Sequence, residues 1–364
     1  MRLKVWDSPT RLFHWSLVGA VGVCAVTGFV LSSRWFGWHF LAGYLIAALL
    51  VFRIVWAALG SEHSRAAGFL PRPAQVIGHL RAVLRGHPPQ SVGHNPAGGA
   101  MVLTLLAVLT LLVCTGLSAL GGMDKQGPLA AFLSYDQGHT VKDLHEMLAY
   151  GLLALVGVHV AGVLAESWLD RQSLILSMIT GFKRVPDGTP APRPARTAPA
   201  LLALGLAAAA LGGGGWALSS LPVRGWHPLT DMPAAYGKEC GACHMAYHPS
   251  LLPAASWAKV MDSLDNHFGE DASLPAATAQ SIGQWLTGNS AEQWDTKPAN
   301  VLRAVSADEP RRITETPWWK RKHRHIPAAI FAQKSVKMRG NCAACHHDAA
   351  AGTFRVQAID VPHP

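Results

Sequence analysis

The sequence predicts an all-α protein with a transmembrane four-helix bundle, a fifth transmembrane helix and a mostly helical C-terminal domain outside the cytoplasm. Of its 364 residues, 50% are hydrophobic and 15% are charged, a balance typical of membrane proteins. Five apolar stretches have about the 20 residues that an α-helix needs to cross a bilayer. The part of the chain after the fifth stretch contains one short motif in two copies.

The repeated motif is Cys-x-x-Cys-His, at residues 240–244 and 342–346. This pattern is typical of covalent c-type haem attachment, in which two thiols bind the porphyrin and the adjacent His becomes an iron ligand. Disulfides and a zinc site are the alternatives, but zinc does not need a His directly after each cysteine pair. Because the two copies use four of the six cysteines, we expect two covalently bound c haems. The residues concerned are Cys240, Cys243, His244, Cys342, Cys345 and His346.

The five apolar stretches lie at about 13–31, 40–59, 100–120, 144–164 and 199–218, each bounded by polar or charged residues. Between the second and the third, residues 60–99 are polar and contain several prolines. Their middle part, 74–84, has apolar residues at helical spacing. This spacing predicts a short helix that lies on the membrane surface.

Lysine and arginine are unevenly distributed among the loops, which predicts the orientation of the spans. The N-terminal tail, the 60–99 loop and the segment after the fourth span are basic, whereas the other two loops hold only Arg34, Lys125 and Lys142. Since basic loops belong in the cytoplasm, five spans place the N-terminus inside and the C-terminal domain outside. Haem is attached to c-type motifs in that outer compartment, so the two observations agree. The same bias accounts for the net charge of +9, and no nucleic-acid motif is present.

A proline-rich linker at 186–199 leads into the fifth span. The Ala, Leu and Gly content of this span resembles a secretion signal, whose cleavage would release the C-terminal domain. Because the chain continues without a break, we expect the span to remain as an anchor. The predicted domains are therefore a membrane domain at 1–184, the linker with the fifth helix at 185–219, and a C-terminal domain at 220–364.

Four histidines lie in or at the ends of the first four spans: His14, His39, His145 and His159. Ionisable residues in a membrane are costly and mark functional sites. His145 and His159 are 14 residues apart, which on a helix is about 21 Å along the axis and roughly 40° around it. In the predicted topology, His14 and His159 lie towards the cytoplasm and His39 and His145 towards the outside. Each pair is positioned to hold one haem b between neighbouring helices, although helix packing remains an alternative for any single histidine.

Three segments carry a resemblance to a known family. They are Trp6-Asp-Ser-Pro-Thr-Arg-Leu-Phe-His-Trp15, Gly93-His-Asn-Pro96, and Leu144-His-Glu146 followed by Leu155-x-x-x-His159. Residues 1–184 thereby resemble the bacterial cytochrome b561 family and the b-type subunits of nickel-iron hydrogenase and formate dehydrogenase. The resemblance implies a four-helix bundle with two b haems, each held by two His. It also implies electron exchange with ubiquinone or menaquinone in a bacterial inner membrane, and therefore a periplasmic C-terminal domain.

The C-terminal domain carries a second resemblance in residues 239–244, 267–269, 312–318 and 341–346. These segments are similar to the dihaem cytochrome c family, which implies a second His on each iron. His267 for the first haem and His323 for the second match the family best, and the opposite assignment stays open. His325 stands where the family usually carries an acidic residue. The other candidate ligands are His248, His325, His347, His363, Met245, Met261 and Met338.

A short basic run surrounds His323 and consists of Lys320, Arg321, Lys322 and Arg324. A solvated surface is one interpretation of the run. The other is a docking patch for an acidic electron-transfer partner or for haem propionates. The histidines of the 60–99 loop, by contrast, are expected at the protein surface: His63, His79, His87 and His94.

Together these features predict a membrane electron conduit. Quinol is oxidised in the bilayer, and electrons pass through two b haems and two c haems to a soluble periplasmic acceptor, such as a c-type cytochrome; reversed flow uses the same path. This would make the chain a quinol:cytochrome c-type oxidoreductase, with Arg11, Arg53 and His94 as candidate quinone contacts. One alternative is a superoxide oxidase that passes electrons from superoxide to ubiquinone, with Lys125 or Lys142 guiding the anion. Another is a purely structural membrane portion that anchors the C-terminal domain in a homodimer.

Overall fold

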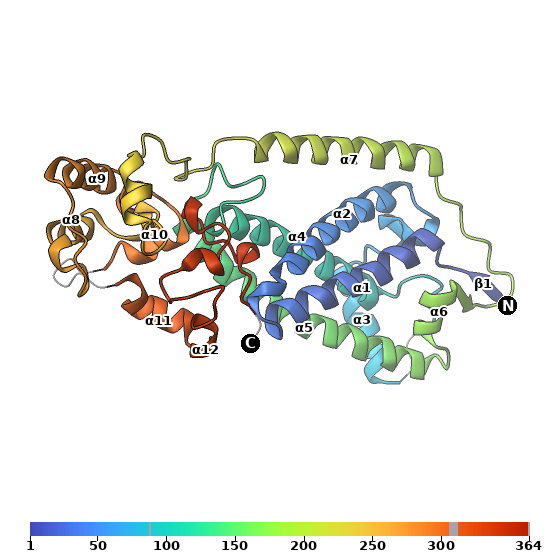
Figure 1. The fold of residues 1–364 in the computed structure, drawn as a ribbon. Coiled ribbons are helices and arrows are strands. Elements are labelled where there is room, and N and C mark those ends of the chain that lie inside the picture. The colour runs from blue at the N-terminus through green and yellow to red at the C-terminus, as the bar shows by residue number, and fades with distance from the viewer. Residues whose placement is uncertain (87–88, 306–311, 363–364) are drawn as a thin grey trace. The chain divides into compact units, whose positions relative to one another are not determined.

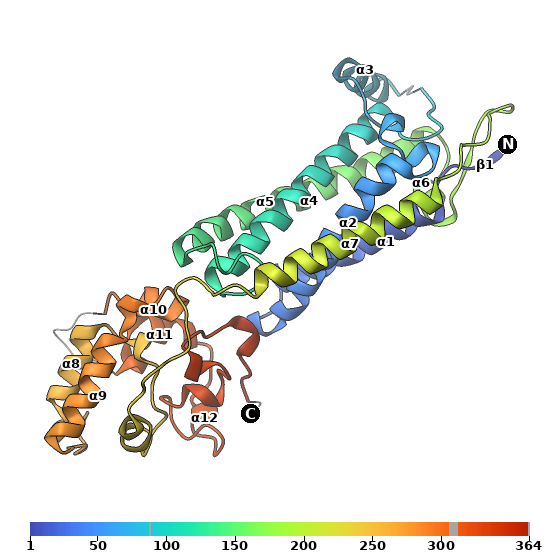
Figure 2. The same ribbon diagram turned by 90° about the horizontal axis from the view of Figure 1, so that it is seen from above.

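The structure, a computed structural model, describes residues 1–86, 89–305 and 312–362. The chain divides into two compact units (Figures 1 and 2). The bundle unit comprises Met1–Gly116 and Lys142–Gly215, and the C-terminal unit comprises Leu117–Val141 and Trp216–Pro364. The described helices are α1 (Ser8–Phe29), α2 (Phe36–Leu59), α3 (Pro73–Leu84), α4 (Pro96–Met123), α5 (Tyr135–Leu169), α6 (Leu174–Thr180), α7 (Thr197–Ser219), α8 (Ala254–Asp262), α9 (Ala276–Gly288), α10 (Lys297–Leu302), α11 (Pro317–His323) and α12 (Ala328–Phe331).

The predicted fold class is confirmed. Five helices, α1, α2, α4, α5 and α7, are long and apolar enough to cross a membrane. The short helix expected in the 60–99 loop is α3, which begins at a proline where a helix tolerates it. A small two-stranded antiparallel sheet, β1 (Arg2–Lys4) with β2 (Phe182–Arg184), is the one described strand pairing, and the sequence analysis did not predict it.

Four of the long helices, α1, α2, α4 and α5, form the bundle and run alongside one another in both views (Figures 1 and 2). Their buried core is apolar, and each of the four helices contributes to it: Ala20, Ala42, Ile46, Leu50, Leu109, Leu112 and Leu152. Most of the remaining apolar surface is exposed, as a helix that faces lipid requires. The fifth helix, α7, buries none of its most apolar window and stays outside this core.

One carboxylate, Asp7, organises the N-terminal end of the bundle. It caps α1 by accepting a hydrogen bond from the Thr10 backbone N–H at 2.8 Å, and it accepts another from Trp56 Nε1 of α2 at 3.0 Å. Burial opposes ionisation here, but hydrogen bonds from Ser61, Thr10 and Trp56 lower the pKa of Asp7 below its ordinary value. Asp7 therefore connects the start of α1 to α2 and to the loop that follows α2 through hydrogen bonds.

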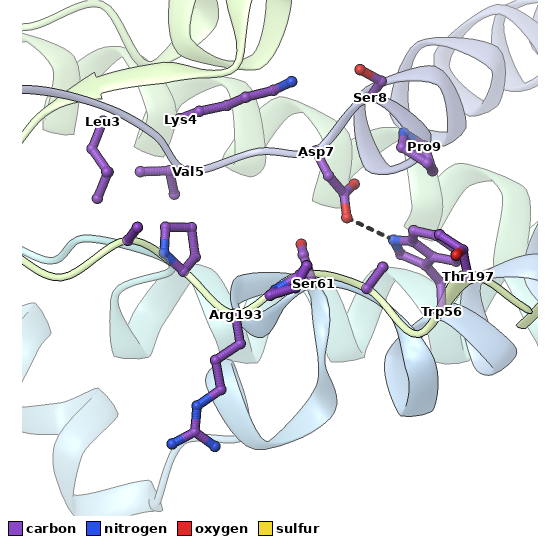
Figure 3. A pocket seen from close by; sticks show the side chains of 14 residues that line it. Leu3, Lys4, Val5, Asp7, Ser8, Pro9, Trp56, Ser61, Arg193 and Thr197 are labelled. Atoms are coloured by element: carbon purple, nitrogen blue, oxygen red, sulfur yellow. Dashed lines mark hydrogen bonds between the residues drawn. The ribbon is translucent and has the colours of Figure 1, made fainter. Parts of the chain in front are cut away.

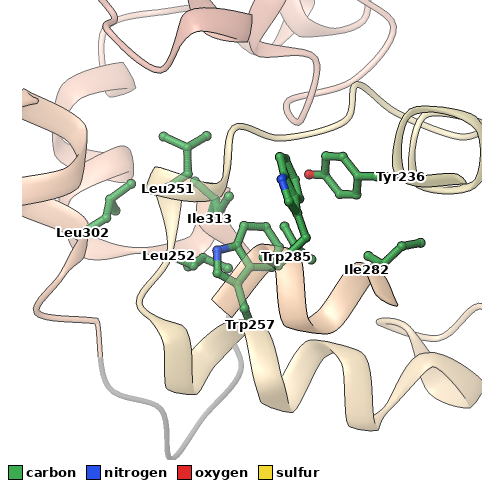
Figure 4. Close-up of a cluster of buried hydrophobic side chains, with 9 residues drawn as sticks. Tyr236, Leu251, Leu252, Trp257, Ile282, Trp285, Leu302 and Ile313 are labelled. Carbon is green, nitrogen blue, oxygen red and sulfur yellow. The ribbon is translucent and has the colours of Figure 1, made fainter. Parts of the chain in front are cut away.

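The C-terminal unit has its own hydrophobic core beneath the first cysteine motif (Figure 4). Tyr236, Trp257 and Trp285 fill it together with leucines and isoleucines, and Cys240 and Met261 pack against its edge. Trp257 donates its indole N–H to the Pro249 carbonyl at 2.7 Å, so the buried nitrogen is satisfied. The core fixes α8, α9 and α10 around the segment that precedes Cys240.

The segment that joins α4 to α5 belongs to the C-terminal unit, and one buried ion pair secures it. Lys125, whose side chain is 2% exposed, lies 2.8 Å from Asp295. The same Asp295 oxygen accepts the Tyr135 backbone N–H at 2.9 Å, and Arg224 donates its backbone N–H to the Ala130 carbonyl at 3.1 Å. Burial lowers the pKa of Lys125, and the hydrogen bond and charge of Asp295 oppose that shift.

Replacing Asp295 with Ala is expected to destabilise the C-terminal unit, because it leaves a buried ammonium without a counter-charge. The expected loss is about 3 kcal/mol or more of unfolding free energy. Lys142→Gln is the matched control: Lys142 is exposed and paired with Glu146 at 2.6 Å, and such pairs are worth about 1 kcal/mol or less. Thermal unfolding of the detergent-solubilised protein measures both. Equal melting temperatures for the two variants would contradict the role given to Asp295.

Candidate metal centres: four pairs of histidines

His39 and His145 face each other inside the bundle. His39 lies near the start of α2 and His145 lies in α5, and their ring centroids are 6.2 Å apart at an interplanar angle of 66°. Metal–nitrogen bonds of about 2.0 Å to two imidazoles on opposite sides of an ion place the centroids about 6 Å apart. The observed separation therefore fits a single iron between the two rings.

Both rings are oriented by a threonine from the preceding span. Thr27 Oγ1 lies 3.1 Å from His39 Nδ1, and Thr115 Oγ1 lies 3.0 Å from His145 Nδ1. A hydrogen bond at Nδ1 leaves Nε2 as the ligand nitrogen, the arrangement usual for metal-binding histidines. Each threonine precedes a glycine, and a Cβ at Gly116 would lie 3.2 Å from His145 Cε1. The sequence analysis missed both threonines, although the repeated Thr-Gly near the ends of the first and third spans was a visible signal.

The Thr115 hydroxyl donates to its own helix, at 2.8 Å from the Leu111 carbonyl, so its oxygen accepts from the His145 ring. Such a bond makes the imidazole a stronger donor and favours oxidised iron. Thr115→Val is expected to raise the reduction potential of one b haem by on the order of 60 mV. For a one-electron couple, this shift equals a tenfold change in the ratio of the site's affinities for oxidised and reduced iron. Thr110→Val is the matched control, since the exposed Thr110 bonds only to the Leu106 carbonyl in its own helix. A redox titration in which both variants match the wild type would exclude this effect.

His14 of α1 and His159 of α5 are close enough for their side chains to interact electrostatically. His159 also interacts in this way with His94, which precedes α4. The His94 ring is enclosed by Trp6 at 4.7 Å and Phe69 at 5.6 Å. Burial and then the charge of Arg53 lower the pKa of His94 to about 3, so this imidazole is neutral at physiological pH.

The expectation that the 60–99 histidines lie at the surface is wrong for two of them. His79 is 3% exposed and lies 2.7 Å from Glu166 of α5, so α3 is attached to the bundle through a buried polar contact. His94 is partly buried because Trp6, which follows β1, packs against its ring just before the start of α4. His87 lies outside the described residues.

The first cysteine motif in the C-terminal unit has a histidine opposite it. His244 and His267 are 6.3 Å apart between centroids, with nearly parallel rings. His244 donates from Nδ1 to the Met245 carbonyl at 2.7 Å, which leaves Nε2 for a metal. Next to His267, Phe268 lies under the Arg312 guanidinium, which donates to the Phe268 carbonyl at 2.9 Å. Burial, followed by His244 and Arg312, lowers the pKa of His267 and favours the neutral, metal-binding form.

The second motif has an equivalent arrangement. His346 and His323 are 6.1 Å apart between centroids. His323 stacks on Trp319 at 4.2 Å and donates from Nδ1 to the Trp319 carbonyl at 2.9 Å. Trp319 is the orienting residue that the sequence analysis did not single out.

The remaining candidate ligands have other contacts. His248 is buried, bonds Ser250 Oγ at 2.7 Å and packs on Trp294, and burial lowers its pKa to about 4. His325 is exposed and bonded to Arg324, whereas Met261 packs against the core. His363 lies outside the described residues. These contacts favour His267 and His323 over the alternatives.

Tyr247 connects the two motifs, a role that sequence reasoning missed. Its ring stacks on His244 at 4.8 Å, and its hydroxyl donates to the Gly340 carbonyl at 3.0 Å, two residues before Cys342. Burial raises the pKa of Tyr247, so the hydroxyl remains a donor. Tyr247 thus contacts His244 of the first motif and the segment that leads into the second.

The four motif cysteines are free thiols in the structure, as covalent haem attachment requires. The disulfide alternative therefore has no support. In the part of the chain that the structure describes, no three His, Cys, Asp or Glu side chains gather as a zinc site needs. The pairs of facing histidines beside free thiols fit c-type haem better than either alternative.

A pocket of about 530 Å³ lies at the N-terminal end of the bundle unit, between the β1 segment and the linker before α7 (Figure 3). Asp7, Trp56 and Ser61 are among the residues that line it, and Arg193 comes from the linker. None of the eight paired histidines lines it. The candidate metal centres are therefore separate from this pocket.

Comparison with known proteins supports both parts of this description. Residues 5–181 match the family described as prokaryotic cytochrome b561, and residues 236–354 match the family described as dihaem cytochrome c. The chain joins a cytochrome b561 domain to a dihaem cytochrome c domain. This confirms the two resemblances noted in the sequence.

Relatives of known description cover one half of the chain or the other. A probable Ni/Fe-hydrogenase B-type cytochrome subunit of Cupriavidus necator is 29% identical over 213 residues, which are 50% of this chain and 87% of the relative. A probable Ni/Fe-hydrogenase 1 B-type cytochrome subunit of Escherichia coli is 24% identical over 211 residues, which are 49% of this chain and 89% of the relative. A solved dihaem cytochrome c from Rhodobacter sphaeroides is 40% identical and covers 35% of this chain and 100% of its own, with a TM-score of 0.30. The protein is thus an integral membrane electron-transfer protein with domains of the haem b and haem c types.

Proposed function

We propose that this cytochrome b561–cytochrome c protein oxidises membrane quinol and passes the electrons to a soluble periplasmic acceptor. The facing histidines support the proposal most directly. Three of the four pairs have ring separations of 6.1–6.3 Å, and the fourth interacts electrostatically. Three facing pairs, together with His14 and His159, match a four-centre electron path.

In this proposal the side chains have defined roles. His14 with His159, and His39 with His145, ligate the two b-type irons; the cysteine motifs with His267 and His323 hold the two c-type groups. When bound, each haem supplies a one-electron couple. Thr27, Thr115 and Trp319 hold the ligand rings in place, which limits the reorganisation that accompanies each transfer.

The proposed orientation places the N-terminus in the cytoplasm and the C-terminal unit in the periplasm of a bacterial inner membrane. The distribution of Lys and Arg among the loops supports it. The hydrogenase-type relatives are named as subunits of a larger enzyme, and each matches about half of this chain. In this chain the fused dihaem domain is the proposed electron partner of the cytochrome b561 domain.

Two observations weigh against the superoxide oxidase alternative. The lysines expected to guide the anion are both engaged: Lys125 is buried against Asp295, and Lys142 is paired with Glu146.

The three candidate quinone contacts differ in their hydrogen bonds. Arg11 and Arg53 donate to the backbone carbonyls of Ile179 and Ser64. His94 Nδ1 and Arg11 Nε are buried without a hydrogen-bond partner among the described residues, so these two candidates keep free hydrogen-bonding capacity.

Anaerobic addition of quinol to the purified protein tests the proposal. A pyridine haemochrome assay should first give equal amounts of b and c haem. Quinol should then reduce both types. If c haem alone is present, or if superoxide but not quinol reduces the protein, the proposal fails.

A further inference from the structure

The two c-type sites of the C-terminal unit lie in surroundings of opposite charge. Residues 317–347, which contain His323 and His346, include seven Lys or Arg and no Asp or Glu. Residues 261–271, which contain His267, include four Asp or Glu and no Lys or Arg. A soluble partner of one charge sign therefore meets attraction at one site and repulsion at the other.

The seven cations form what we call the basic segment: Lys320, Arg321, Lys322, Arg324, Lys334, Lys337 and Arg339. All seven side chains are exposed. Within the residues that the structure describes, none of them lies within ion-pair distance of a carboxylate. Their charges are thus available to a partner, since no acid within the described ranges 1–86, 89–305 and 312–362 pairs with them.

The basic segment is continuous with the second c-type site. Lys320, Arg321 and Lys322 lie on α11, the helix that ends at His323. The buried Trp319 of the same helix stacks on His323 and accepts its hydrogen bond. Arg339 lies over the Phe331 ring and is three residues before Cys342, where the second cysteine motif begins. A molecule bound to these cations therefore contacts the elements that hold both histidines.

We propose that an acidic soluble redox protein docks on the basic segment and accepts one electron at the His323–His346 site. The inference rests on the proposed function, because it needs reduced c haem at that site. The acceptor gains one electron, the site loses one, and no bond is made or broken. The four acids around His267 repel the same partner, so the second site is the exit.

Stopped-flow oxidation of dithionite-reduced protein measures the docking. Two soluble one-electron acceptors serve as probes: an acidic plastocyanin and the basic mitochondrial cytochrome c. The rate constant for plastocyanin should fall as salt is added, and the triple substitution K320E/R321E/K322E should lower it by about tenfold or more at low ionic strength. The same variant should react faster than the wild type with the basic probe.

The matched control is D262K/D265K, which reverses exposed acids near His267. It should not lower the plastocyanin rate, because it leaves the basic segment intact and reverses two of the acids that repel an acidic partner. Covalent haem content and visible spectra verify that each variant is folded. An unchanged plastocyanin rate in K320E/R321E/K322E overturns the docking site, as does a larger loss in the control. Since dithionite supplies the electrons, this result stands apart from the quinol experiment, which alone decides the proposed function.

Discussion

Replacing His145 with Ala is expected to remove one of the two b haems and to stop quinol from reducing the c haems. His39 would then face no second ring across the 6.2 Å separation, and Thr115 would lose the imidazole that it orients. In the proposed path this centre is the step between the other b-type centre and the c-type centres. A haemochrome assay should show half the b haem and all the c haem. Quinol reduction of c haem should fall by at least about 100-fold, because loss of a hydrogen-bond partner of a ligand already costs about 10- to 100-fold.

His139→Ala is the control for this variant. His139 also lies on α5, six residues earlier, but it is exposed and its ring contacts only Tyr135 among the described aromatic neighbours. It should keep both b haems and the wild-type rate. Dithionite should reduce the c haems in both variants, which verifies that those centres are intact. Retention of two b haems in His145→Ala would show that the histidine pairing is wrong.

Replacing His323 with Ala is expected to open one coordination position at the second c-type site without releasing the haem. Thioether bonds to Cys342 and Cys345 would still hold the haem, whereas the facing ring at 6.1 Å is lost. Reduced protein should then bind carbon monoxide at one c haem per chain, and the low-spin spectrum of that haem should disappear. His323→Met should instead restore a sixth ligand and raise the reduction potential, because thioether ligation favours reduced iron.

His325→Ala separates this role from that of a neighbouring histidine. His325 is exposed, two residues after His323, and bonded to the Arg324 side chain. The reduced His325→Ala protein should not bind carbon monoxide. Binding to His325→Ala and not to His323→Ala would reverse the assignment that the structure favours.

The sequence was sufficient for features that depend on short segments. Span length and apolarity identified the five long helices because a bilayer imposes its thickness on each helix separately. The Cys-x-x-Cys-His motifs identified the c-type sites because the thiols and the proximal His lie within five residues. The 14-residue spacing of His145 and His159 predicted that they share one face of a helix. This prediction needs only the 3.6 residues per turn of that helix and no contact with another.

The tertiary structure decided the features that join distant segments. From the sequence, Lys125 was a candidate to attract an anion. In the structure it is instead paired with Asp295, 170 residues away. Sequence reasoning placed His79 at the surface, whereas Glu166 of α5 holds it inside. Hydrogen bonds between side chains far apart in the chain leave no local pattern, because each partner is a common residue in an ordinary context.

The sequence by itself therefore determined the class of protein, the membrane spans, the haem types and the histidines worth testing. Only the tertiary structure showed that three pairs of those histidines face one another at 6.1–6.3 Å between ring centroids, and that Thr27, Thr115 and Trp319 hydrogen-bond to ligand rings. The reason is physical: ligation depends on the positions of two rings to within a fraction of an ångström. Those positions are set by packing between helices, which the sequence of a single helix does not encode.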